Sequence, residues 1–122
     1  MATIRAYTTI EQSRKLAEIL PLESADIIIV SIGDREGVKT ITMPKETLNI
    51  LRTPFTDIRD TIPCWSLAAL LGVLPNDTSL LYFDDTYQMV YDKKPYVISN
   101  KFDNPVDACY EMILKLHELN LL

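Results

Sequence analysis

Residues 62 to 75 carry no charged side chain and read Ile-Pro-Cys-Trp-Ser-Leu-Ala-Ala-Leu-Leu-Gly-Val-Leu-Pro. Four leucines in this segment recur at i, i+3, i+4 and i+7, the spacing of one helix face. They are Leu67, Leu70, Leu71 and Leu74. Proline suits the first helical position and disfavours helix just before itself, so Pro63 and Pro75 bound the expected helix. We expect this helix to be buried and to form the centre of the core.

Two further helices are indicated by signals at their N-termini. Thr8 and Glu11 fit a capping box, which predicts a helix that extends to about Leu20. Asn104 is a strong N-cap with a proline after it, and the apolar stripe that follows predicts a long C-terminal helix. Residues 45 to 52 have a weaker pattern, from which we expect a short fourth helix.

The remaining apolar segments have the character of strands. Residues 27 to 32 are a β-branched run, which predicts a strand buried on both faces, and a Gly-containing turn after it predicts a hairpin. An Asp84-Asp85 turn and a Lys-Lys-Pro turn separate three later strands of an antiparallel meander. The expected strands cover residues 27–32, 38–43, 80–83, 87–91 and 96–99. Residues 53 to 61 have a loop-like composition.

These elements predict an α+β fold with three main helices packed on a largely antiparallel sheet of about four to six strands. The chain of 122 residues contains no repeat, low-complexity tract or linker. Its length is typical of one domain. We therefore expect a single globular domain over residues 1 to 122.

Charge and composition bear on the partners that the chain can bind. The formal net charge is −5, and Lys and Arg are not clustered, so the chain lacks the basic surface of a nucleic-acid binder. The longest apolar run is too short for a membrane helix, and the first residues lack the pattern of a signal peptide. We expect a cytoplasmic protein that contacts neither nucleic acid nor membrane.

Cys64 is the strongest candidate for chemistry, because a thiol in the first turn of a helix feels the positive end of the helix dipole. A nucleophilic thiol also needs a base, and His117 is the only histidine in the chain. We favour the alternative, in which Cys64 and Cys109 are reduced thiols of the core and His117 is stabilised by the C-terminal end of its helix. No residue is therefore assigned a catalytic role.

The free N–H groups at the start of the same helix could bind an anion. The alternative that we favour is that Asp60 or Thr61 caps them. Asp84, Asp85 and Asp92 form the nearest acidic cluster, but they lack the spacing of a calcium loop and are better explained as turn residues. We expect no metal site and no cofactor.

Tyrosines gather on the predicted meander. Tyr82, Tyr87, Tyr91 and Tyr96 fall on adjacent strands. Tyrosine combines apolar area with a polar tip and is enriched at interfaces, which suggests a homodimer through this face of the sheet. We favour the alternative, in which at least half of these side chains line the covered face of the sheet, and a homodimer is expected only if the tyrosines form an exposed face.

Several segments resemble a family of short uncharacterised proteins from gut anaerobic bacteria, often encoded in phage-like or mobile DNA. They are residues 11–16, 22–26, 63–71 and 104–113, of which the block that begins Pro-Cys-Trp-Ser is the most specific. They lie in three blocks of similarity that together cover about half the chain. The family has no known activity, so the resemblance implies a class of protein and no site residues.

We therefore expect a non-catalytic cytoplasmic protein that acts through protein–protein contacts, in a setting of mobile or phage DNA. The alternative function is that of a small enzyme or an anion-binding or ligand-binding protein that uses Cys64 at the helix N-terminus. A deep pocket shared by Cys64, Asp60 and His117 would favour this alternative.

Overall fold

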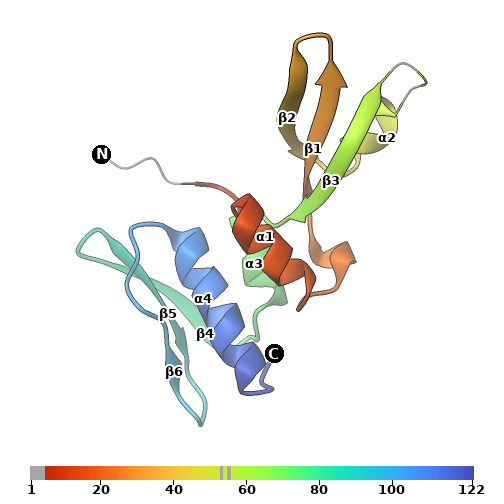
Figure 1. Cartoon of the computed structure of the whole chain (residues 1–122). Coiled ribbons are helices and arrows are strands. Elements are labelled where there is room, and N and C mark those ends of the chain that lie inside the picture. The colour runs from red at the N-terminus through yellow and green to blue at the C-terminus, as the bar shows by residue number, and fades with distance from the viewer. Residues whose placement is uncertain (1–4, 53, 55) are drawn as a thin grey trace. The chain divides into compact units, whose positions relative to one another are not determined.

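A computed structural model of the chain describes residues 5–52, 54 and 56–122 (Figure 1). Its contacts divide the chain into two units, Thr9–Trp65 and Met1–Thr8 with Ser66–Leu122. Each unit combines helices with an antiparallel sheet, which confirms the α+β class. In the described residues each sheet has three strands, fewer than the four to six that we expected of one sheet.

The unit Thr9–Trp65 is built around strand β1, which pairs with β2 on one side and β3 on the other. Its elements are α1 (Ile10–Ala17), the 3₁₀ turn η1 (Leu22–Ser24), β1 (Ile27–Asp34), β2 (Gly37–Pro44), α2 (Thr47–Leu51) and β3 (Asp57–Cys64). The β1–β2 hairpin is confirmed. Helix α1 packs along β3 and α2 packs on β2.

Helix α1 begins one residue later than the sequence indicates. Thr9 is its N-cap, and its hydroxyl accepts a hydrogen bond from the Gln12 N–H at 3.1 Å. The Gln12 side chain accepts from the Thr9 N–H in return, also at 3.1 Å. The capping box thus uses Thr9 and Gln12 in place of Thr8 and Glu11. Glutamine serves as well as glutamate at this position of the motif, so the pattern fits two adjacent registers.

The largest difference from our predictions lies at residues 57 to 66. We expected a loop followed by a helix from Pro63, but Asp57–Cys64 forms strand β3. Ile62 pairs with Ile29 and Cys64 pairs with Ile27, and these four side chains form one apolar cluster. The helix N-cap is Ser66, whose hydroxyl accepts from the Ala69 N–H at 3.1 Å.

The second unit places two helices and a meander together. Its elements are α3 (Leu67–Val73), β4 (Thr78–Phe83), β5 (Thr86–Tyr91), β6 (Val97–Ile98) and α4 (Pro105–Glu118). The strands have the order β4-β5-β6, which confirms the antiparallel meander. Helix α4 packs on α3 and lies against β5 and β6 (Figure 1).

Both ends of α4 agree with the sequence. The Asn104 side chain accepts from the Val106 N–H at 2.9 Å. At the other end Asn120 has a φ of 57°, and the Leu121 N–H donates to the Leu116 carbonyl at 2.8 Å. This left-handed residue closes the helix.

The N-terminal segment is described from Arg5 onward. Residues 3 and 4 lie outside the described residues. Tyr7 forms an isolated antiparallel bridge with Ser66, and the Ala6 carbonyl accepts from the Leu67 N–H at 3.1 Å. These contacts attach the segment before Thr8 to the start of α3.

Helix α3 is shorter than predicted, and its leucines are not equally buried. Leu70 is completely buried and Leu74 nearly so, whereas Leu71 is 42% exposed. A core truncation of leucine to alanine costs about 2 to 5 kcal/mol because it removes transfer free energy and leaves a cavity.

We expect Leu70→Ala to lower the free energy of unfolding by about 2 to 5 kcal/mol. Leu71→Ala is the matched control on the next residue of the same helix, and its effect should stay below about 1 kcal/mol because the side chain is partly solvated. Denaturant titration measures both. Equal effects of the two substitutions would contradict this assignment of the core.

Candidate functional site

Both cysteines belong to the interior. Cys64 ends strand β3, so it does not lie in the first turn of a helix, where the helix dipole was expected to act on it. Its side chain is completely buried, and so is that of Cys109 in α4; neither forms a disulfide. Burial raises the pKa of the Cys109 thiol to about 12. Both thiols have the surroundings of structural side chains.

The other two residues of the alternative that uses Cys64 are exposed, whereas Cys64 is buried. His117 is exposed near the C-terminal end of α4. Asp60 is exposed on β3 and caps no helix. The prediction that Cys64, Trp65 and Ser66 donate free N–H groups from a first helical turn is wrong, because the helix begins only at Leu67.

Trp65 has a structural role. Its side chain is completely buried, and its indole N–H donates to the Ser24 hydroxyl at 2.9 Å. The Ser24 hydroxyl in turn donates to the Pro21 carbonyl. This pair of bonds satisfies the polar atom of a buried aromatic side chain and connects η1 to the residue that follows β3.

Asp84 and Asp85 belong to a turn. Asp84 and Asp85 form the two-residue loop between β4 and β5, with φ angles of 52° and 59°. Two successive positive φ angles are the geometry of a type I′ turn, in which aspartate is one of the preferred residues. Within the described residues, no group of three or more His, Cys, Asp or Glu side chains is placed to hold a metal ion.

The four tyrosines do not share one exposed surface. Tyr87 and Tyr91 lie on the same face of β5 as Met89, which is completely buried, and Tyr91 is only 7% exposed. Tyr82 lies opposite Tyr87, with ring centroids 4.8 Å apart. Tyr91 thus lines the covered face, in line with the alternative that we favoured for these tyrosines, while Tyr82 and Tyr96 are exposed.

The opposite face of this sheet exposes apolar side chains. Leu81, Phe83 and Ile98 are 47%, 68% and 54% exposed, and Val90 lies between them on the central strand. The strand register places Leu81 opposite Gln88 and Ile98 opposite Val90. We call these four apolar residues the outer face. Sequence reasoning missed it, although the period-two pattern assigns these residues to the face opposite Met89.

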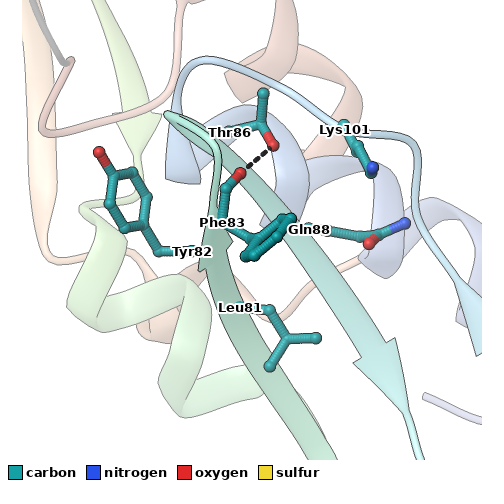
Figure 2. A pocket seen from close by; sticks show the side chains of 6 residues that line it. All are labelled: Leu81, Tyr82, Phe83, Thr86, Gln88 and Lys101. Carbon is teal, nitrogen blue, oxygen red and sulfur yellow. Dashed lines mark hydrogen bonds between the residues drawn. The ribbon is translucent and has the colours of Figure 1, made fainter.

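A hollow of about 420 Å³ lies at one end of the outer face. It is lined by Leu81, Tyr82, Phe83, Thr86, Gln88 and Lys101. Figure 2 shows Leu81 and Phe83 on one side of β4 and Tyr82 on the other. The Thr86 hydroxyl donates to the Phe83 carbonyl at 2.7 Å and fixes the end of the hairpin. The lining is suited to contact with apolar groups and supplies no nucleophile beside a base.

Asp77 and Asp85, at the two ends of β4, both have side-chain partners. The Tyr82 hydroxyl donates to the Asp85 carboxylate at 2.9 Å, and this bond raises the pKa of Tyr82 above its ordinary value. Lys93 forms an ion pair with Asp77 at 3.0 Å, and the bond that it donates raises the pKa of Lys93. Both aspartates therefore accept a hydrogen bond, and Lys93 also offsets the charge of Asp77.

A second, more open hollow of about 370 Å³ lies between α1 and β3. It is lined by Arg14, Ala17, Asp60, Thr61, Ile62 and Pro63. Arg14 and Asp60 are both exposed there. This surface has ordinary solvated charges, and the buried Cys64 thiol is not among its lining residues.

Comparisons of this chain with protein-family models, with curated proteins and with solved structures find no match. Within the described residues, no helix is both long enough and apolar enough to cross a membrane. The inference about function therefore depends on the surfaces described above.

Burial predicts that both thiols are unreactive in the folded chain. At pH 8, iodoacetamide should modify Cys64 and Cys109 only after denaturant unfolds the protein, because both side chains are completely buried and inaccessible to the reagent, and burial also raises the pKa of Cys109 to about 12. Mass spectrometry of the native and unfolded chain, sampled over time, measures this. Rapid modification of native Cys64 would restore it as a candidate nucleophile.

Proposed function

We propose that this chain is a non-catalytic cytoplasmic protein that acts through protein–protein contacts made by the outer face of the β4-β5-β6 sheet. The observation that supports the proposal is the exposure of Leu81, Phe83 and Ile98 together on one face. Single exposed apolar residues are common on protein surfaces, whereas a contiguous group of them is typical of interaction sites.

The form of the outer face suits a protein partner. Phe83 and Leu81 project from one strand beside the aliphatic part of Gln88, so an apolar side chain of a partner would find apolar contacts in the hollow (Figure 2). Lys101 lies at its margin and can orient a partner by a polar contact. A central apolar group with polar groups around it is the usual composition of such interfaces.

Burial of the thiols favours this function over the alternative. An enzyme that used Cys64 would need its sulfur at a surface and a base beside it, and Cys64 is completely buried. The two reduced thiols and the acidic net charge are compatible with the cytoplasmic location that we propose. We also retain as a proposal the setting in phage-like or mobile DNA that the resemblance implies.

Photo-crosslinking in cells of the organism that encodes the chain tests this function. A benzophenone amino acid at position 83 should form adducts with protein, because Phe83 is 68% exposed on the outer face. The control carries the same probe at Ile50, which is 80% exposed but lies in the other unit. We expect adducts at position 83 to be at least roughly tenfold more abundant than at position 50, because a bound partner keeps its own groups at high local concentration beside the probe.

Mass spectrometry of the adducts distinguishes a second copy of the chain from a different protein, and either supports the proposed function. Equal, low yields at positions 83 and 50 would contradict it.

A further inference from the structure

Strand β4 is an edge strand with no protection against pairing. Its sequence, Thr-Ser-Leu-Leu-Tyr-Phe, has no charge and no proline over six residues. Natural edge strands are usually protected by charges, prolines, bulges or short length. The other edges in the described residues have such features: β2 contains Lys39 and Pro44, β3 has three charged residues and a bulge, and β6 has two residues.

The hairpin geometry identifies which backbone groups of β4 face the open edge. A two-residue loop makes its flanking residues, Phe83 and Thr86, a hydrogen-bonded pair. Such pairs alternate with non-hydrogen-bonded pairs along an antiparallel ladder. Leu80 and Tyr82 therefore point their N–H and C=O groups away from β5.

Backbone bonds on β5 agree with this assignment. The Tyr87 N–H donates to the Phe102 carbonyl at 2.6 Å, and the Phe102 N–H donates to the Tyr87 carbonyl at 2.9 Å. Tyr87 is the residue opposite Tyr82, and both of its backbone groups are directed away from β4. The same parity then holds for Tyr82, whose groups face the other way.

We propose that the edge of β4 pairs antiparallel with β4 of a second copy, about a two-fold axis at Leu81; this deepens the proposed function and rests on it. In this register Leu80 of each copy exchanges two hydrogen bonds with Tyr82 of the other. Leu80 and Tyr82 both face outward and are separated by one position, so the strand is complementary to itself in this register. The result is a continuous six-stranded sheet, and a two-fold contact of this kind closes as a dimer.

Side chains near the axis also suit a second copy. Leu81 meets Leu81 on the outer face, and Phe83 lies opposite Ser79 of the other copy, so the outer faces become one continuous apolar surface. On the other face Tyr82 packs beside Leu80 of the second copy. None of these side chains carries a charge that would repel its own copy.

Charges at the ends of the strand limit the strength of the contact. The register places Asp85 opposite Asp77 of the second copy. Each copy already pairs Asp77 with Lys93 and bonds Asp85 to the Tyr82 hydroxyl, so part of the repulsion is offset. A six-residue strand spans only about 20 Å, which gives a small interface. We expect a dimer with a dissociation constant of about a micromolar or weaker, and tighter at higher salt.

Disulfide trapping of Leu81→Cys tests the register. A non-hydrogen-bonded antiparallel pair has its Cα atoms about 4.5 Å apart, within the range that a disulfide spans. The variant should form a covalent dimer on mild oxidation, and the buried native thiols should not compete. Non-reducing electrophoresis measures the rate of dimer formation.

Two controls make the test specific. Ser79→Cys places its thiol on the same face of β4, but this register separates the two thiols by about 14 Å along the strand. Ile98→Cys places it on the opposite edge strand. Both should crosslink at least roughly tenfold more slowly than Leu81→Cys, because only position 81 of one copy lies opposite the same position of the other copy. Equal rates for the three variants would contradict the proposal.

Light scattering supplies an independent measurement on the unlinked protein. The mass of the wild-type chain should rise from 13.9 kDa towards twice that value with concentration. Leu81→Lys should remain monomeric, while Ile98→Lys, with the same charge change on the same face, should still dimerise. A wild-type chain that stays monomeric would overturn the self-pairing.

Failure of the self-pairing is distinguishable from failure of the proposed function. Adducts with a different protein at position 83, together with no disulfide at position 81, would reject the second copy and leave a protein-contact function in place. If neither experiment detects a contact, both proposals are wrong.

Discussion

Burial of Met89 between β5 and α4 is the constraint on which the second unit depends. Met89 is completely buried, and α4 packs on the strand that carries it. Because side chains alternate across a strand, fixing Met89 inward fixes Gln88 and Val90 outward. The hairpin register then places Leu80 inward and Leu81 outward on β4. A slip of β4 by one residue would move Leu80 to the outer face and Leu81 to the inner face, and the loss of core burial opposes it.

The same constraint determines where function can reside. The core side of the sheet holds Met89 and Tyr91, and the helices that cover it bury the Cys109 thiol. Apolar side chains left on the outer face have no covering element among the described residues of their own unit. The two thiols are therefore inside, while the apolar groups available for contacts are outside, and this division supports the contact function proposed above.

Much of the fold could be predicted from local patterns, and the failures have a common physical origin. The caps of α4, the Asp84-Asp85 turn and the antiparallel meander depend on neighbouring residues, and the sequence identifies all three. Residues 57 to 64 become a strand because they pair with β1, which is distant in sequence. The uncharged run from residue 62 contains both the end of β3 and the start of α3. Only Ser66, the N-cap of α3, marks the boundary between them. The false helix start in turn suggested a reactive Cys64.

The outer face was missed for a similar reason, since periodicity separates two faces but α4 decides which is covered.

Hydrogen exchange of the β4 amides, at a concentration where the chain is monomeric, tests whether β4 is an open edge with this register. The amides of Ser79, Leu81 and Phe83 donate to β5 in this structure and should be protected. Those of Leu80 and Tyr82 face the open edge and should exchange at rates close to those of an unstructured peptide, at least roughly a hundredfold faster than their neighbours. Equal protection of all five amides would contradict the assignment of β4 as an open edge, and the inverse alternation would show that the register is wrong.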